Sequence, residues 1–314
     1  MKRHPVLNLR ELQVFQAVVE CGSLGKASEV LNLTQPALTR ILKRLEEQLG
    51  VALFDRHAHG MSLTPYGRAL EPHASLMLSE SGHAVRALRE MQGLERGVVR
   101  VGAVSSAVEH FLPDAVGRLT ERHPGVQVHI VEGLSDELAV WLAKGDIDLA
   151  IGFSMPADDA ISLVSESEWQ EGCHVVAAMD HPLRARPSLT LADLAGQRWV
   201  LVPRKMGPRE EWQQLFWSQR MAPPPVAVEA RSTSAIRALV ARCGFLSWMP
   251  RVLLGECQGP SRAIEVLPVE GVASVRTFAL FQRRHGTLSP ATVRLRDDLL
   301  ASIRALPSAV RTGP

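Results

Sequence analysis

The sequence predicts an α/β protein that begins with an all-α winged helix-turn-helix unit and a long linker helix. Three observations lead to this fold class. Residues 23–56 read as a helix, a tight turn and a second helix with basic and amide side chains on its exposed face. Residues 66–94 repeat apolar side chains every three or four positions. From residue 98 onward, short apolar strands alternate with helices.

Two helix caps define the helix-turn-helix. Ser23 can cap the first helix and Thr34 the second, because a hydroxyl oxygen can accept a hydrogen bond from a free backbone N–H of the first turn. Pro36 lies early in the second helix, where its missing N–H costs nothing. Residues 32–33 form the turn, and an amphipathic helix over residues 9–19 precedes the pair.

The second of these helices buries a leucine-rich stripe and leaves a face with side chains suited to DNA. Gln and Arg can make bidentate hydrogen bonds to base edges, while Thr and Lys suit phosphates. The residues available on this face are Gln35, Ala37, Thr39, Arg40, Lys43 and Arg44. The helix starts add Ser23, Lys26, Thr34 and Pro36 to the predicted contact surface. An ordinary amphipathic helix with a solvated face is the alternative interpretation.

Two short strands are predicted at residues 51–54 and 61–63, and the loop between them forms a wing. The loop carries Arg56, which can lie along the DNA backbone or enter a narrow minor groove. His57 and His59 in the same loop could hold a metal, but no third ligand is nearby in the sequence. We therefore expect the wing to face phosphates and to bind no metal.

The long helix predicted over residues 66–94 needs a partner for its apolar stripe. The simplest partner is the same helix of a second subunit. Dimeric helix-turn-helix proteins bind half-sites about one helical turn apart, so a dimer through residues 66–94 agrees with the N-terminal unit.

The remaining chain reads as two α/β series. The first has strands at 98–104, 126–131 and 148–153 and helices at 108–121 and 136–143. The second has strands at 173–178, 199–202, 226–229 and 245–249 and helices near 191–194, 209–219 and 234–242. Strands at 264–267 and 276–281 and a helix at 290–306 follow. The strands are nearly continuously apolar, as expected for a parallel sheet covered by helices on both faces.

Short polar residues follow several of these strands, at the junctions with helices. In open α/β sheets, ligands bind at such strand ends, against helix N-termini. The hydroxyl groups could hold a small molecule or could only cap the helices, since Ser and Thr are preferred caps. Both interpretations apply to Ser105, Ser106, Ser135, Ser232 and Thr233.

Composition narrows the classes of function. The net charge is only +2, so binding to DNA must depend on local basic clusters rather than on a uniformly basic surface. No apolar run is long enough to span a membrane, and the N-terminus lacks the apolar core of a signal peptide, so we expect a cytoplasmic protein. Widely spaced cysteines indicate reduced, mostly buried thiols, with a redox switch as the alternative. They are Cys21, Cys173, Cys243 and Cys257.

No pattern in the sequence predicts an enzyme. The common nucleophile, phosphate-loop, zinc-protease and dinucleotide signatures are missing. Ser23 and Lys26 match the S-x-x-K pattern of serine hydrolases, but both lie in the predicted DNA-binding unit. Asp146 and Asp148 flank the turn into a buried strand, which favours a structural role over an acid–base pair. We expect no catalytic residue, no metal and no cofactor.

The ordered motifs of the chain resemble those of the LysR-type transcriptional regulators. The resemblance is strongest in the N-terminal unit and continues more weakly to the C-terminus, so it covers nearly the whole chain. The segments that carry it are Leu12-x-x-Phe15, Gly22-Ser23-x-x-x-Ala27-Ser28-x-x-Leu31, Thr34-Gln35-Pro36-Ala37-Leu38-Thr39-Arg40, Leu45-Glu46-x-x-Leu49-Gly50, Leu53-Phe54-x-Arg56 and Leu63-Thr64-Pro65-x-Gly67.

The resemblance implies three regions. Residues 1–66 would form a winged helix-turn-helix DNA-binding domain, residues 67–95 a linker and dimerisation helix, and residues 96–314 a two-lobed effector domain similar to periplasmic binding proteins. Lobe 1 would hold about 96–166 and 270–306, and lobe 2 about 167–269. The chain would cross between the lobes near 162–171 and 267–274.

The resemblance also implies a function, which is sequence-specific transcriptional regulation. A small-molecule effector of unknown identity, bound between the lobes, would control promoter binding or DNA bending. The expected partners are double-stranded promoter DNA, this effector and identical subunits in a homodimer and homotetramer, with RNA polymerase as a further candidate. The candidate effector site consists of Ser105, Ser106, Ser135, Phe153, Pro203, Arg204, Ser232 and Thr233. The alternative is a small-molecule-binding or enzymatic α/β protein with an accessory DNA-binding domain.

Overall fold

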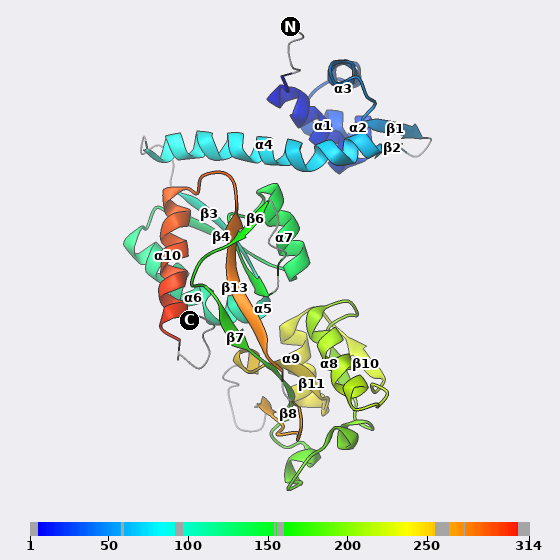
Figure 1. Ribbon diagram of the computed structural model, residues 1–314, viewed down its shortest axis with the longest axis vertical. Coiled ribbons are helices and arrows are strands. Elements are labelled where there is room, and N and C mark those ends of the chain that lie inside the picture. The colour runs from blue at the N-terminus through cyan, green and yellow to red at the C-terminus, as the bar shows by residue number, and fades with distance from the viewer. Residues whose placement is uncertain are drawn as a thin grey trace.

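The computed structural model describes residues 6–57, 60–91, 97–153, 155, 160–254, 264–272 and 274–306. An N-terminal helical domain, one long helix and two α/β lobes follow one another along the chain (Figure 1). The long helix runs from the N-terminal domain across one end of the first lobe, and the second lobe lies at the opposite end. Among the described helices, none combines the length and apolar character needed to cross a membrane.

The N-terminal domain contains the predicted helices α1 (Leu9–Cys21), α2 (Leu24–Leu31) and α3 (Gln35–Leu49). Ser23 caps α2 as predicted, because its side chain accepts a hydrogen bond from the backbone N–H of Lys26. Asn32 and Gly50 end α2 and α3 in the left-handed conformation. The three helices share a core whose fully buried members include Leu12, Phe15, Leu38 and Leu45.

One local prediction in this domain is confirmed only in part, and another is wrong. Thr34 is the N-cap residue of α3, but its side chain makes no capping hydrogen bond. The first strand, β1, spans Phe54–His57 rather than residues 51–54, and it pairs with β2 (Gly60–Leu63). Arg56 therefore lies on a strand and not in a loop. The backbone just before β1 is occupied elsewhere, since Glu46 Oε1 accepts from the N–H of Leu53 at 2.7 Å.

The long helix α4 (Pro65–Met91) begins as predicted, while residues 92–94 of the prediction lie outside the described residues. Its first half packs on the core of its own N-terminal domain, through Ala74, Met77 and neighbouring leucines. That part of the apolar stripe is therefore already covered within one subunit. Farther along, Val85 and Leu88 are 47% and 60% exposed.

Lobe 1 is a mixed sheet in the order β4-β3-β5-β13-β6, with β7 also paired to β13. The strands are β3 (Val98–Ala103), β4 (Gln127–Glu132), β5 (Leu149–Phe153), β6 (Ile161–Leu163), β7 (Trp169–Glu171) and β13 (Arg276–Arg283). β3, β4 and β5 are parallel as predicted. The expectation of an all-parallel sheet is wrong, because β13 returns from the other lobe and runs antiparallel to β5.

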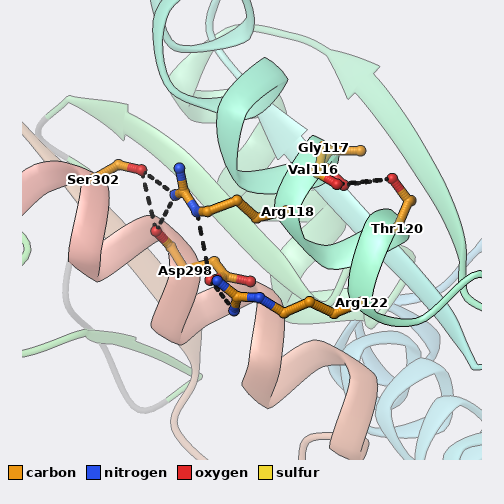
Figure 2. Close-up of polar contacts among 7 residues, drawn as sticks. All are labelled: Val116, Gly117, Arg118, Thr120, Arg122, Asp298 and Ser302. Atoms are coloured by element: carbon orange, nitrogen blue, oxygen red, sulfur yellow. Dashed lines mark hydrogen bonds and ion pairs between the residues drawn. The ribbon is translucent and has the colours of Figure 1, made fainter.

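Helices α5 (Ser105–His110), α6 (Leu112–Arg122), α7 (Ser135–Lys144) and α10 (Pro290–Arg304) cover this sheet. The single helix predicted at 108–121 is two helices, since Pro113 at the start of α6 cannot donate the hydrogen bond that a continuous helix requires. Polar contacts clamp α6 to α10 (Figure 2). Arg118 Nη2 donates to the Asp298 carbonyl oxygen at 2.9 Å, and Arg122 Nη1 lies 3.1 Å from Asp298 Oδ1. This clamp joins the first and last parts of the lobe.

In lobe 2, β8 (Cys173–Ala178) lies between β11 (Ser247–Pro250) and β12 (Ile264–Val266) and is antiparallel to both. The parallel pair β9 (Trp199–Leu201) and β10 (Val226–Glu229) extends the sheet through a bridge between Trp199 and Leu246. The lobe also contains α8 (Gly207–Ser218), α9 (Thr233–Cys243) and short 3-10 turns at Pro182–Ala185, Leu191–Leu194 and Arg251–Leu254. Trp199, Trp212 and Phe216 pack edge to face in its core.

Two neighbouring crossings connect the lobes. β7 pairs antiparallel with the beginning of β13, so the outgoing and returning chains lie side by side (Figure 1). The two crossings are so close at Gly172 that a Cβ atom there would collide with the Ser274 carbonyl oxygen. A glycine is therefore required at this point of the hinge.

Candidate DNA-binding surface and inter-lobe cleft

Most of the predicted DNA-contacting residues are exposed on the N-terminal domain. Those that are exposed are Lys26, Thr34, Gln35, Pro36, Arg40, Lys43, Arg44 and Arg56. Those that are half-buried are Ser23, Ala37 and Thr39. The surface is formed by the start of α2, the start and outer face of α3, and β1. These elements present the helix and the wing that a double-stranded DNA site would meet.

The basic residues of this surface differ in their surroundings. Lys26, Arg40 and Arg56 make no ion pair with the described part of the chain, so their charges are available to phosphates or bases. Lys43 is 3.6 Å from Glu47, and Arg44 Nε is 3.4 Å from the nearly buried Glu11 on α1. Arg44 is therefore held toward α1, and a DNA contact would compete with that ion pair.

The start of α3 is placed closely against α2. A Cβ atom at Gly25 would lie 3.3 Å from Gln35 Nε2, so the absence of a side chain at Gly25 leaves room for Gln35. Thr34 is exposed at the N-cap position and its side chain makes no capping bond, so its hydroxyl group is open to an external partner. Both residues are thus positioned at the exposed N-terminal end of the helix that would read DNA.

Polar contacts close the base of the β1–β2 hairpin and join it to the end of α1. Thr64 Oγ1 donates to the Ala52 carbonyl oxygen at 2.8 Å, and the Met61 N–H donates to the Gly22 carbonyl oxygen at 2.9 Å. His57 Nε2 lies 2.6 Å from Ser62 Oγ on the opposite strand, while His59 lies outside the described residues. The described residues contain no group of three or more His, Cys, Asp or Glu side chains that could hold a metal.

A second candidate site lies between the two lobes. An inner chamber of about 90 Å³ is lined by both lobes, and four of the candidate residues, Ser105, Ser106, Phe153 and Thr233, line it. An outer recess of about 520 Å³ shares several of these residues and adds Ser232. Ser232 also caps α9 by accepting from the N–H of Ala235 at 3.3 Å, so capping and cleft lining coexist there.

Three predicted cleft residues, Ser135, Pro203 and Arg204, line neither of these spaces. Ser135 Oγ turns back to the sheet and accepts from the N–H of Phe153 at 3.2 Å. After Arg204 the chain turns through Lys205, whose φ of 69° is left-handed, and brings Met206 to the cleft instead.

Several cleft residues were not predicted. The inner chamber is mainly apolar, and the additional side chains include Met206, Ile236, Leu253 and Phe278. Two arginines, Arg231 and Arg276, also line it. Arg231 directly precedes Ser232 in the sequence, so its presence in the cleft could be inferred from the predicted position of Ser232. The other residues are brought together only by the topology of the fold.

Ion pairs join the lobes at the mouth of the cleft. Arg231, just before α9, lies 2.9 Å from Glu137 on α7. Arg237 on α9 lies 3.6 Å from Glu109 on α5. The hydrogen bonds to the Leu134 backbone and to Arg231 lower the pKa of Glu137. In the structure the two lobes are thus held together by charges on opposite sides of the mouth.

A charged cluster lies at the hinge side of the cleft. Arg276 Nη2 is 2.7 Å from Cys173 Sγ, and Arg276 Nε is 3.3 Å from Glu211 Oε2. Burial raises the pKa of Glu171 to about 7, although a hydrogen bond with Ser106 and the charge of Arg276 oppose this rise.

Cys173 and Asp148 have structural surroundings. Burial raises the pKa of Cys173 to about 12, which keeps the thiol protonated. Cys21, Cys173 and Cys243 are free thiols, and Cys257 lies outside the described residues. The expectation of mostly buried thiols is wrong, because Cys21 is half-buried and Cys243 is exposed. Asp148 Oδ2 accepts from the backbone N–H of Arg100 at 2.8 Å, which fixes the turn into β5.

Comparisons with known proteins match both regions. The family described as "Bacterial regulatory helix-turn-helix protein, lysR family" matches residues 9–68, and "LysR substrate binding domain" matches residues 92–304. The chain is 30% identical to the HTH-type transcriptional regulator GbpR of Azospirillum brasilense over 300 residues, covering 95% of this chain and 86% of that protein. It is 31% identical to CfxR of Cupriavidus necator over 294 residues, covering 94% and 91%. Full-length CbnR in complex with its target DNA has a similar fold, with a TM-score of 0.64 at 23% identity, covering 94% of this chain and 100% of that chain.

Proposed function

The chain belongs to the LysR family of bacterial transcriptional regulators, and on this premise we propose a separate role for each of its two sites. The N-terminal domain binds a specific promoter sequence through α3 and the β1–β2 hairpin. A small molecule bound in the inter-lobe cleft controls that binding or the bend of the bound DNA. The observation that carries the proposal is the presence of both sites on one chain.

At the DNA surface, Gln35 and Arg40 are the base-reading residues. Both are exposed on α3. Arginine can donate two hydrogen bonds to one base edge, and glutamine can donate one and accept one. Lys26 and Thr34 contact phosphates at the entrance of the helix, and Arg56 contacts the backbone or minor groove from β1. The fold similarity to a CbnR structure that contains target DNA supports this placement of the domain on a duplex.

In the cleft, the effector is held by groups from both lobes. Ser105 and Ser106 come from lobe 1 and Thr233 from lobe 2, and all three line the inner chamber. A ligand that contacts both sides binds one lobe orientation better than another, and only such a difference in affinity can drive a switch.

The subunits assemble through α4. Val85 and Leu88 are exposed apolar residues on the part of α4 that extends beyond its own N-terminal domain, and an equivalent helix can cover them. We propose a homodimer through this helix and a homotetramer built from two dimers, acting on chromosomal DNA in the cytoplasm.

The proposal is tested by substituting the cleft hydroxyls. A thermal-shift screen of organic acids, amino acids, aromatic compounds and sugars first identifies a ligand, and the effect of that ligand on promoter binding is then measured. Ser106→Ala and Thr233→Val should each raise the ligand concentration at half-effect by about fivefold, because each removes a hydrogen bond worth about 1 kcal/mol. Ligand-free DNA binding should not change.

Ser218→Ala is the matched control, because its hydroxyl group donates to the Leu215 carbonyl oxygen on α8, away from the cleft. This variant should respond like the wild type. A normal ligand response in folded Ser106→Ala and Thr233→Val would place the effector elsewhere.

A further inference from the structure

The hinge arginine Arg276 touches both lobes and the inner chamber at once. Its guanidinium lies over the Phe153 ring of lobe 1, with 4.5 Å between the guanidinium carbon and the ring centroid. Its Nε faces Glu211 on α8 of lobe 2 at 3.3 Å. Arg276 itself lies at the start of β13, in the returning crossing. It is therefore placed where a ligand charge can change how the lobes are connected.

Part of the hydrogen-bonding capacity of Arg276 is unused. Nη2 contacts Cys173 Sγ, a weak acceptor, whereas Nη1 and Nε are buried and have no hydrogen-bond acceptor among the described residues. The Nε contact with Glu211 lies within ion-pair distance but lacks hydrogen-bond geometry. A buried guanidinium with unused donors favours an incoming oxygen anion, because buried polar groups are strongly stabilised by a partner.

Glu211 does not depend on Arg276 alone. Its carboxylate also accepts from Trp248 Nε1 at 3.3 Å and from Ser274 Oγ. It can therefore keep two donors when the arginine turns toward another anion. Glu171 is the other acid in this cluster, and its raised pKa of about 7 leaves a large fraction of it uncharged at neutral pH.

The rest of the chamber selects for an apolar body. Phe153, Phe278, Ile236, Trp248 and Leu253 form walls around a space of about 90 Å³. A space of this size admits only a small apolar group. The charged groups on its wall are Arg231, which is paired with Glu137, and Arg276.

We propose that the effector is a small carboxylic acid with a compact apolar body, and that its carboxylate binds to Arg276. This inference rests on the proposed function, in which the cleft holds the effector. The carboxylate competes with Glu211 for the guanidinium and so weakens one contact between the hinge and α8. Acid binding thereby favours a different orientation of the two lobes, and this change in orientation is the regulatory signal.

The test uses full-length protein and matched pairs of probes. Thermal melts are recorded with benzoate, 4-hydroxybenzoate and hexanoate, and with the primary amide of each acid. The acids should raise the melting temperature and the amides should not, because only the acids carry the charge that Arg276 pairs with. An amide effect equal to that of its acid, or the absence of any effect of the acids, would overturn the proposal.

Variants at the cluster sharpen the test. Arg276→Gln should raise the midpoint concentration of the active acid by about 10- to 100-fold, as expected for loss of a charge-assisted hydrogen bond. Arg186→Gln removes the same charge from a lobe 2 arginine that is 54% exposed and paired with Asp193, and it should leave the midpoint unchanged. An unchanged midpoint in folded Arg276→Gln contradicts the proposal.

Glu211→Gln should lower the midpoint concentration of the active acid, opposite to the effect of Arg276→Gln. This variant also tests the proposal if Arg276→Gln does not fold. It removes the competing carboxylate, so the acid should bind more tightly. Unchanged or weaker binding contradicts the proposal. If neutral probes bind and lose their effect in Thr233→Val, the effector cleft stands and only the acid class is wrong. If no compound of any class alters promoter binding, the proposed function itself fails.

Discussion

Ser23 and Thr34 both occupy N-cap positions in the helix-turn-helix, yet the structure gives them different roles. Ser23 Oγ accepts from the N–H of Lys26 at 3.3 Å. Thr34 makes no such bond, and it is exposed. Replacement by alanine should therefore affect stability at Ser23 and DNA affinity at Thr34.

The magnitudes follow from these contacts. Ser23→Ala removes a formed cap and should lower the free energy of unfolding of the N-terminal domain by about 1 kcal/mol. Thr34→Ala should change it by less than about 0.5 kcal/mol, as for an exposed side chain without a structural partner. If the Thr34 hydroxyl donates to a phosphate, Thr34→Ala should weaken DNA binding about fivefold, because a neutral hydrogen bond is worth about 1 kcal/mol. The salt dependence should not change, since no charge is removed.

Hydrogen exchange on the full-length chain measures the local free energy of unfolding of the N-terminal domain, and fluorescence anisotropy measures affinity for promoter DNA. Thr34→Ser keeps the hydroxyl group and should behave like the wild type in both assays. The reasoning is refuted if Thr34→Ala destabilises α3 as much as Ser23→Ala destabilises α2, because a capping bond would then form at Thr34 in solution.

Three other predictions concern charge and assembly. Arg56→Ala should weaken DNA binding and reduce the slope of log affinity against log salt by about one unit, whereas an unchanged slope would exclude a phosphate contact. Leu88→Glu should dissociate the dimer in light scattering, because it places a charge in the exposed apolar part of α4; an intact dimer would mean that α4 pairs elsewhere. Burial raises the pKa of Glu171 from 4.5 to about 7, so the folded state retains a proton that the unfolded state has lost. The free energy of unfolding should therefore fall from about pH 5 to pH 7, by on the order of 2 kcal/mol, and Glu171→Gln should remove this fall; an equal fall in the variant would assign it to other groups.

The elements predicted from local patterns largely match the structure. The cap at Ser23, the turn at Asn32 and the apolar stripe of α3 are determined by neighbouring residues, so one stretch of sequence was enough to place them. The break between α5 and α6 was also visible locally, since Pro113 cannot continue a helix. Thr34 shows the limit of this approach, because a suitable residue type at a cap position does not guarantee the hydrogen bond.

The cleft could be predicted only in part. Ser105, Ser106 and Thr233 follow a general rule about strand ends, and they line the chamber. Arg276, Glu211 and Trp248 come from separate strands and helices, and no spacing along the chain indicates that they meet. Their proximity depends on the return of β13 beside β7. β13 is antiparallel to β5, whereas the sequence predicts a parallel sheet.

The central claim is that α3 reads a DNA sequence, and selection from a random duplex library tests it most directly. Full-length wild-type protein should enrich a motif with two half-sites about one helical turn apart. Gln35→Ala and Arg40→Ala should each relax the base preference at one position of each half-site, with a loss of about 1–3 kcal/mol on the wild-type motif. If the wild type enriches no motif, or if both variants enrich the same motif with the same preference, α3 does not read the bases and the account is wrong.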